Sequence, residues 1–437
     1  MIIGYACWMR NALLLSLVAA VGCSRGAPAR TYISIGADAL GTVGAVAAEQ
    51  HALLSVLAVN DRVAVLAVDP SELEPLSERM HEEHRRCGGF MVHTSLEEAL
   101  ASRVVPSDGE PIEYTLDRAA AVRAVLPALD PAKILATIGE LSGMKNRYYR
   151  SDTGAAASIW LRDRWQSFTT RTDVTIELVD HGYPQKSVIL TIPGTTRANE
   201  VVVLGGHLDS IALGGNAARA PGADDDASGI ATLTEIVRVL LAKDFRPART
   251  VKIMAYAAEE VGLRGSLSIV KEFGKRRINV VGALQLDMTN YQGSDKDIWL
   301  IQDYTDAAQN TFLARLIDTY VGASWGIDVC GYACSDHAAW HRAGVPASMP
   351  FESRFHDSNR SIHTPEDTLE RSENNATHAV KFARLGAAYA IELAKGELGA
   401  AEVAASSVPP ASPHSRWPLV GTLLALLGLA AATRRIV

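Results

Sequence analysis

A histidine and an aspartate follow an apolar run in the middle of this sequence. Residues 201–204 are all aliphatic and lead through two glycines into His207 and Asp209. This pattern predicts a buried strand that reaches its carboxyl end, where ligands bind in open α/β sheets. A histidine with an aspartate two residues on is typical of a metal ligand and the carboxylate that orients it. The stretch therefore indicates a metal site, and the alternative is a capped surface loop.

Three consecutive aspartates, residues 224–226, follow in a glycine-rich loop before a predicted helix at 228–241. At a helix N-terminus each carboxylate would gain only about 0.3–1 kcal/mol from the helix dipole, and the three would repel one another. A divalent cation would remove that repulsion. Metal binding therefore explains this second stretch better than a solvated loop does.

Further acids and a histidine complete the set of residues that could bind metal or transfer protons. Glu259 and Glu260 follow a predicted strand at 251–256, Asp287 ends another, and His363 lies in a loop before a helix. Because adjacent side chains diverge, one glutamate can bind a metal while its neighbour acts as a general base. Each stretch alone could be a solvated helix start or an edge residue. Together, two histidines and three carboxylates fit two Zn²⁺ ions that share a bridging carboxylate.

The elements that must position these side chains alternate between strand and helix over residues 112–397. This alternation predicts an α/β fold with a mixed, mostly parallel β-sheet sandwiched by helices. The strands are expected at 187–192, 201–204, 251–256, 280–286 and 298–301. The helices are expected at 131–141, 155–166, 228–241, from 263, at 307–320 and at 376–394.

Residues 31–108 form a separate small α+β module in our interpretation. Strands are predicted at 32–35, 63–68 and 89–92, and a helix at 71–86. Within that helix His81 and His84 are three residues apart, whereas the zinc motif H-E-x-x-H places its histidines four apart. We therefore expect them on a solvated helix face. A Pro- and Gly-containing stretch at 105–111 predicts a linker after the module.

The region 112–397 resembles the secreted bacterial leucyl aminopeptidases, exopeptidases that use two co-catalytic zinc ions. The similarity is closest in G-G-H-L-D-S, P-G-A-D-D-D-A-S-G, A-Y-A-A-E-E-V-G-L-R-G-S, L-Q-L-D-M-T-N-Y and C-G-Y-A-C-S-D-H. The resemblance implies the zinc exopeptidase fold. It also implies an enzyme that releases the N-terminal residue, preferably a hydrophobic one, from peptides with a free amine.

The resemblance also assigns roles to the residues above. Asp225 would bridge the two metals, with a cis peptide bond after it. Glu259 would be the general base, and Asp209 would orient His207. The remaining ligands would be His207 and Asp287 at one zinc, and Glu260 and His363 at the other.

An apolar pocket for the first substrate side chain is a further implication of the resemblance, with Tyr332 donating to the scissile carbonyl. Its lining would comprise Met288, Ile301, Cys334, Phe351, Phe355 and Ile362, each of which could alternatively be ordinary core. Ser358 stands where we expect a tyrosine, which predicts a wider pocket and weaker leucine selectivity.

Cys330 and Cys334 are expected to form a disulfide, which would stabilise the fold by about 2 kcal/mol for so short a loop. A pair of zinc ligands is the alternative.

Two other motifs are interpreted as chance. His337 and His341 are four residues apart but are expected to pack beside Trp340. Residues 322–326 match G-x-S-x-G, but they follow a predicted helix, whereas a nucleophile elbow needs strand, turn and helix in that order.

The two ends of the 437-residue sequence predict export. Residues 1–29 have a basic start, an apolar run and an A-x-A site, as in a signal peptide; lipidation at Cys23 is the alternative. Residues 401–418 read as an Ala/Ser/Pro linker, and residues 419–437 as a hydrophobic sorting tail that would contact the membrane transiently. We expect a secreted protein, periplasmic or surface-anchored before its tail is processed. The net charge of −7 argues against a nucleic-acid partner.

We therefore predict a monomeric, secreted two-zinc aminopeptidase that acts on peptides. By position, the module at 31–108 would be its propeptide, which assists folding and holds the enzyme inactive. Related alternatives are a metallo-carboxypeptidase and a one-zinc glutaminyl cyclase of the same fold. The non-enzyme alternative is a receptor-like ectodomain without metals.

Overall fold

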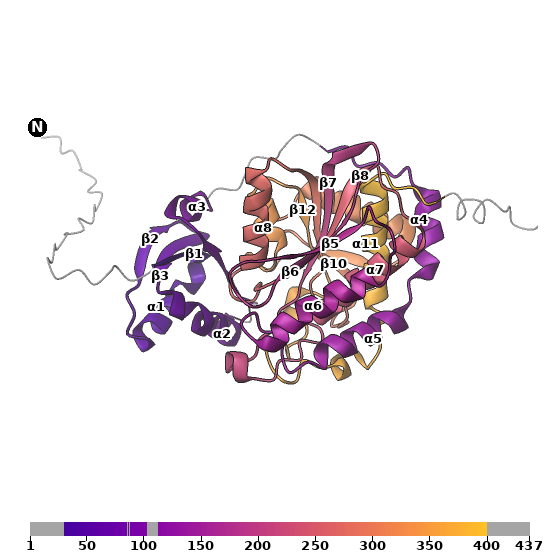
Figure 1. Ribbon diagram of the computed structural model, residues 1–437. Coiled ribbons are helices and arrows are strands. Elements are labelled where there is room, and N and C mark those ends of the chain that lie inside the picture. The colour runs from indigo at the N-terminus through magenta and orange to yellow at the C-terminus, as the bar shows by residue number, and fades with distance from the viewer. Residues whose placement is uncertain (1–29, 85, 87, 103–111, 400–437) are drawn as a thin grey trace, which may run out of the picture.

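The computed structural model describes residues 30–84, 86, 88–102 and 112–399 (Figure 1). The predictions for the signal peptide, Cys23, the interdomain linker, the C-terminal linker and the sorting tail lie outside these residues, as does Cys87. Among the described helices, none is both long enough and apolar enough to cross a membrane.

Six strands form the central sheet, in the order β12-β9-β7-β8-β6-β5. β7 pairs in parallel with β8 and β9, β12 pairs in parallel with β9, and β6 runs antiparallel to both β8 and β5. The mixed, mostly parallel sheet predicted from the sequence is confirmed. The strands are β5 (Thr175–Val179), β6 (Ser187–Ile192), β7 (Arg197–His207), β8 (Arg249–Tyr256), β9 (Asn279–Gln285) and β12 (Ala347–Ser348).

Helices cover both faces of this sheet because its strands are apolar on both sides. Val202 and Leu204 of β7 belong to the large core under α5, α6, α7 and α11, whereas Val201 and Val203 face α8 and α10. This is the alternation that a strand requires. The helices of this domain are α4 (Ala119–Val125), α5 (Pro131–Ser142), α6 (Asp152–Gln166), α7 (Ala227–Ala242), α8 (Arg264–Lys275), α9 (Ala307–Leu316), α10 (His337–Arg342) and α11 (Ala379–Leu393).

A three-stranded sheet with the order β11-β10-β13 lies beside the central one. It consists of β10 (Ile298–Ile301), β11 (Trp325–Asp328) and β13 (Pro350–Phe351). After α9 a π-helical turn, Ile317–Val321, ends at Gly322, and the chain enters β11. The G-x-S-x-G match therefore runs from helix to strand, opposite to the order that a nucleophile elbow needs.

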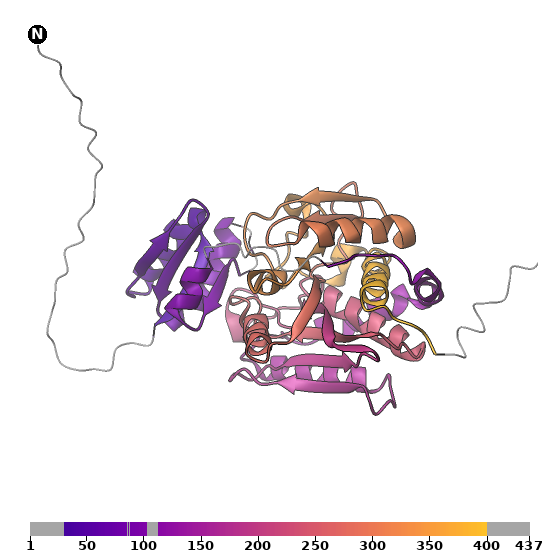
Figure 2. The ribbon, with the colours of Figure 1, turned by 90° about the horizontal axis from the view of Figure 1, so that it is seen from above.

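The N-terminal module has its own antiparallel sheet, in the order β2-β3-β1-β4, and its own apolar core. Its strands are β1 (Thr31–Gly36), β2 (Ser55–Val59), β3 (Val63–Val68) and β4 (Phe90–His93), and its helices are α1 (Leu40–Glu49), α2 (Leu73–His84) and α3 (Leu96–Ala101). Figure 2 shows the module against one side of the larger domain. Its helix α2 and strand β4 both contact that domain.

The start of α7 lies very close to the end of β9. A Cβ atom on Gly229 would be 2.2 Å from the carbonyl oxygen of Leu286 and 2.4 Å from Oδ1 of Asp226. We expect Gly229→Ala to lower the free energy of unfolding by about 1–3 kcal/mol, because backbone would have to move. Gly274→Ala, at an exposed position of α8 with nothing within 4 Å, is the matched control and should raise it by up to about 1 kcal/mol. Urea denaturation of both variants tests this, and equal destabilisation would contradict it.

Candidate metal centre and active site

Three neighbouring strands end at the same edge of the central sheet. β8, β7 and β9 are parallel, so their carboxyl ends lie together. β7 ends at His207, Glu259 and Glu260 follow β8, and Asp287 follows β9. The sheet register alone therefore brings these four side chains to one place.

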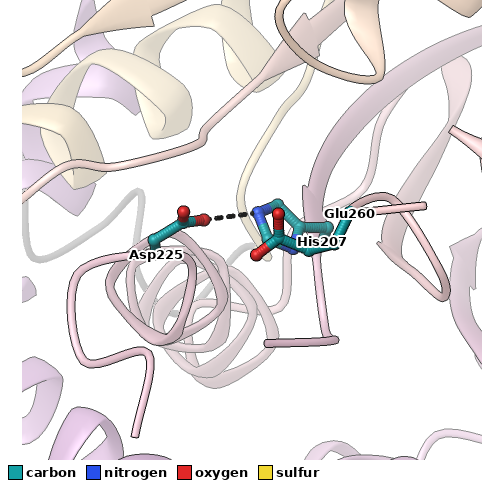
Figure 3. A group of neighbouring side chains, drawn as sticks. All are labelled: His207, Asp225 and Glu260. Carbon is teal, nitrogen blue, oxygen red and sulfur yellow. Dashed lines mark hydrogen bonds and ion pairs between the residues drawn. The ribbon is translucent and has the colours of Figure 1, made fainter. Parts of the chain in front are cut away.

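Asp225 lies between two histidines. Its Oδ1 is 2.9 Å from Nε2 of His207 (Figure 3), and its Oδ2 is 3.2 Å from Nε2 of His363. Each histidine also faces a second carboxylate: His207 is 3.5 Å from Asp287, and His363 is 2.7 Å from Glu260. All five side chains are buried. The structure thus brings together every residue predicted as a ligand, in two groups that share Asp225.

These residues fit a metal ion. The ligand atoms of His207, Asp225 and Glu260 all lie within 4.8 Å of one another. Buried carboxylates are costly without a compensating positive charge, and imidazole with carboxylate oxygen is a donor set that zinc accepts. The predicted metal site is therefore confirmed as a cluster of side chains that could hold a metal ion.

Asp226 also comes within 4.8 Å of His207 and Asp287, but its oxygens are already used. It accepts hydrogen bonds from the backbone N–H groups of His207 (3.0 Å), Gly229 (2.8 Å) and Met288 (3.1 Å). Asp226 therefore caps α7 and joins it to the ends of β7 and β9, and it is not counted as a ligand. The peptide bond between Asp225 and Asp226 is cis, as the resemblance implied.

Asp209 joins the loop after β7 to the loop after β8. Its carboxylate accepts hydrogen bonds from the backbone N–H groups of Glu259 (3.0 Å) and Glu260 (3.2 Å). Its Oδ1 lies 3.5 Å from Nδ1 of His207, but its backbone carbonyl oxygen is closer, at 3.1 Å. Asp209 is therefore next to His207, as expected, and it also holds the two glutamates in place.

Glu259 differs from the other predicted site acids, because it has neither a hydrogen bond nor an ion pair to another described side chain. It is fully buried, and neither carboxylate oxygen has a hydrogen-bond partner among the described residues. Burial, with the neighbouring Glu260 in support, raises the pKa of Glu259 well above its ordinary value. Burial also raises the pKa of Glu260, to about 7. Burial alone would raise the pKa of Asp225 too, but hydrogen bonds with His207 and His363 lower it.

Two supporting residues were missed in the sequence analysis. Asp367 accepts a hydrogen bond from the backbone N–H of Asp225 (3.2 Å) and one from Nδ2 of Asn359 (3.0 Å). The hydroxyl of Ser335 donates to Asp287 at 2.5 Å. Ser335 lies in the motif that was noted for Cys330 and Cys334, and Asp367 lies in the loop that was noted for His363. The spacing of these polar residues gave no signal of which ligand each would support.

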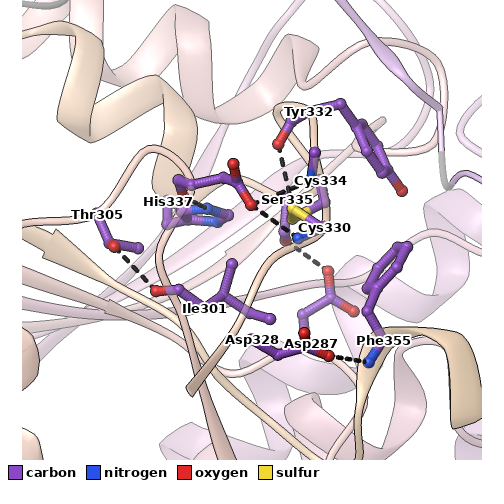
Figure 4. Close-up of a disulfide and its surroundings, with 12 residues drawn as sticks. Asp287, Ile301, Thr305, Asp328, Cys330, Tyr332, Cys334, Ser335, His337 and Phe355 are labelled. Carbon is purple, nitrogen blue, oxygen red and sulfur yellow. Dashed lines mark hydrogen bonds between the residues drawn. A yellow bond between two sulfur atoms is a disulfide. The ribbon is translucent and has the colours of Figure 1, made fainter.

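The six residues predicted to line a substrate pocket lie with Tyr332 in one apolar cluster beside the metal site. The cluster also contains Met349 and Cys330, and Cys330 is joined to Cys334 by a disulfide (Figure 4). Nearby, Ser358 donates to the carbonyl oxygen of Phe355 (2.9 Å) and lines a separate polar cavity of about 420 Å³ with Tyr291.

Helix α2 of the N-terminal module packs over the metal site. Ser77 donates its hydroxyl to the backbone oxygen of Glu260 (2.6 Å), and the ring of His81 lies 4.5 Å from that of His363, centroid to centroid. The expectation that His81 is solvated is wrong: it is 7% exposed. Helical spacing could not reveal that this face meets another domain.

His337 and His341 are not part of the site. His337 is buried, its Nε2 lies 3.1 Å from the backbone oxygen of Asp303, and burial lowers its pKa to about 3. Trp340 between them donates from Nε1 to the hydroxyl of Tyr256 (2.9 Å). These contacts agree with the predicted packing role.

Substitution of Asp209 tests how far the loops depend on it. In Asp209→Asn an amide replaces one of two acceptor oxygens that receive backbone N–H groups. We expect a loss of about 1–3 kcal/mol in the free energy of unfolding and weaker zinc binding, measured by urea denaturation and chelator competition. Asp163→Asn, at an exposed site on α6, is the control and should change neither. A variant with unaltered stability would contradict this role for Asp209.

Comparisons with known proteins agree with this geometry. Residues 187–388 match the model of peptidase family M28. The chain is 38% identical over 275 residues to leucine aminopeptidase 1 of Uncinocarpus reesii, covering 59% of this chain and 69% of the relative. A similar match, also 38% identical, is leucine aminopeptidase 1 of Coccidioides posadasii, over 58% of this chain and 68% of the relative.

Solved structures show the same fold. The LapA aminopeptidase of Legionella pneumophila matches with a TM-score of 0.73 and 30% identity, over 85% of this chain and all of LapA (100%). LapB from the same organism matches with a TM-score of 0.71 and 31% identity, over 84% of this chain and 100% of LapB. The relatives found by sequence are fungal, so they leave the bacterial part of the predicted resemblance untested. The chain belongs to peptidase family M28 and is a metalloaminopeptidase.

Proposed function

We propose that this protein is a secreted aminopeptidase that uses two zinc ions to release hydrophobic N-terminal residues from peptides. The observation that carries the proposal is the position of Asp225, which turns one oxygen to His207 and the other to His363. A carboxylate so placed can bridge two ions, with Asp287 completing one site and Glu260 the other. Glu259 lies beside them, and neither of its carboxylate oxygens has a hydrogen-bond partner in the described part of the chain.

In the proposed reaction the zinc pair supplies Lewis acidity toward the attacking water and the scissile carbonyl. Glu259 accepts a proton from that water on a carboxylate oxygen. It then gives the proton to the nitrogen of the leaving peptide as the amide bond breaks. Both carboxylate oxygens of Glu259 lack a hydrogen-bond partner among the described residues, so either can take up the proton and release it. The surrounding carboxylates favour binding of the positively charged N-terminal amine of the substrate. Cleavage would therefore take place at the end of a peptide, as in an exopeptidase.

The apolar cluster beside Asp287 supports a hydrophobic first residue. Met288, Ile301 and Phe351 are each at most 2% exposed, so the cluster presents apolar surface that is shielded from water. Burial of a leucine side chain contributes about 1.5–3 kcal/mol. Tyr332 lies at the edge of the cluster, next to Phe355, where its hydroxyl is proposed to donate to the substrate carbonyl.

We also propose that the N-terminal module is an inhibitory propeptide. Besides the contacts of Ser77 and His81, the backbone N–H of Val92 donates to the oxygen of Gly262 (3.1 Å), in the loop that carries Glu259 and Glu260. Arg86 lies 5.0 Å from the ring centre of Tyr332. The module therefore contacts the glutamate loop, a histidine and the proposed substrate pocket together, and a peptide could not reach them while it is docked.

Glu259→Gln should lower kcat by about 10²–10⁴-fold, because the amide cannot accept the proton. Hydrolysis of leucine-p-nitroanilide by the zinc-loaded enzyme, freed of its module, would measure this, and the zinc content should be unchanged. Acetyl-leucine-p-nitroanilide is the control substrate, and it should not be cleaved. Cleavage of peptides from the carboxyl end instead would favour the carboxypeptidase alternative.

Ser77→Arg tests inhibition by the module. The larger side chain must displace α2 from Glu260, at a cost of about 1–3 kcal/mol, so the undocked fraction and the activity of the intact chain should rise about 5- to 150-fold. Glu82→Arg, on an exposed position of the same helix, is the control and should leave activity unchanged. If the intact wild-type chain is already as active as its isolated catalytic domain, the inhibitory role is wrong.

A further inference from the structure

Arg147, in the segment between α5 and α6, has no accessible surface although its side chain carries a permanent charge. Its guanidinium group donates to four backbone oxygens: from Nε to Leu208 (2.9 Å), from Nη2 to Gly222 (2.9 Å), and from Nη1 to Pro221 (2.5 Å) and, at longer range, to Leu141 (3.5 Å). No carboxylate of the described residues lies within ion-pair distance of it. A buried arginine whose donors all go to backbone is unusual, because burial of a charge normally requires a paired acid.

The three closer acceptors belong to the two loops that present metal ligands, whereas Leu141 belongs to α5. Leu208 directly follows His207, and Pro221 and Gly222 lead into Asp225. The backbone of Arg147 strengthens the same link: its N–H donates to Oγ of Ser210 (3.0 Å). Ser210 in turn donates to the backbone oxygen of Ala220 (2.8 Å), in the second loop. The segment around Arg147 therefore fixes the distance between the loop of His207 and the loop of Asp225.

The loop fits closely around the guanidinium group. Gly222 has a φ angle of +51°, and a Cβ atom there would lie 2.8 Å from Nη2 of Arg147 and 2.3 Å from the backbone oxygen of Asp225. The planar guanidinium group holds its donors in a fixed fork, so it can bind several oxygens at set angles. A lysine carries the same charge on a single nitrogen and cannot reach all three oxygens in this arrangement.

We propose that Arg147 is a positioning residue of the metal centre, which holds His207 and Asp225 at the separation that a shared metal requires by fixing both of their loops. The inference rests on the two-zinc site proposed above. The positive charge of Arg147 affects zinc affinity in the opposite direction, because a cation near Asp209 and Asp226 weakens the attraction of those acids for a metal ion. The hydrogen bonds and the charge therefore make opposite predictions for the effect of substitution on zinc affinity.

Arg147→Lys keeps the charge and loses the fork, whereas Arg147→Met loses both. If positioning dominates, both variants of the full chain should bind zinc about 10–100-fold more weakly in competition with a chromophoric chelator. The visible spectrum of the cobalt-substituted protein should change in both. At saturating zinc, kcat of the module-free enzyme should fall with little change in KM, because Arg147 does not touch the apolar cluster.

Arg249→Met is the matched control. Arg249 is also buried and donates to backbone, at Leu393, but it lies at the start of β8, away from the metal site, and pairs with Glu200 of β7. It should lower stability without altering zinc affinity or the cobalt spectrum. Ser210→Ala removes the second link between the loops, and it should also weaken zinc binding if the Arg147 variants do not fold.

The outcomes separate this inference from the proposed function. Wild-type zinc affinity and an unchanged cobalt spectrum in Arg147→Lys and Ser210→Ala would overturn the positioning role. Tighter zinc binding by Arg147→Met, with Arg147→Lys unchanged, would also overturn it and leave only the charge. Failure of the wild-type protein to bind zinc at all would instead contradict the two-zinc proposal.

Discussion

The structure of this peptidase depends on one carboxylate that faces two histidines. Asp225 is buried and lies within 3.2 Å of both His207 and His363, although these come from a strand end and a distant loop. Such a concentration of charged groups away from water is unfavourable unless every group is compensated. Much of the surrounding structure can be understood as the means of bringing these side chains together and keeping them there.

Acids that are not ligands hold the ligand loops. Asp209 binds the backbone of Glu259 and Glu260, Asp226 binds the backbone of His207 and Met288, and Asp367 binds the backbone of Asp225. Each connects one loop of the site to another. Because a carboxylate accepts N–H donors strongly, this use of buried acids both compensates their charge and fixes the loops. The same carboxylates make the region attractive to cations.

The N-terminal module packs against the larger domain beside two of the predicted metal ligands, Glu260 and His363. Its contacts include the backbone oxygen of Glu260, the ring of His363, and ion pairs of Glu74 with Arg150 and of Glu98 with Lys271. The five predicted metal ligands all belong to the larger domain.

Much of the fold and the ligand set could be predicted from the sequence. β6 and β10 were predicted with their observed bounds, because a strand buried on both faces reads as a short continuous apolar run. Strands β2, β5, β11, β12 and β13 were missed, since they are short or half exposed and carry no such run. The six-residue helix α10 was missed as an element because it is too short to show a helical period.

The sequence by itself determined the kind of chemistry, because each ligand lies at the end of a recognisable strand or loop and parallel strands end at a common edge. Only the tertiary structure decided which acids hold the backbone, that His81 lies against His363, and that Arg147 joins the loops of His207 and Asp225. These are contacts between residues far apart in the chain. Local patterns record whether a side chain is buried, but they do not record what it meets there.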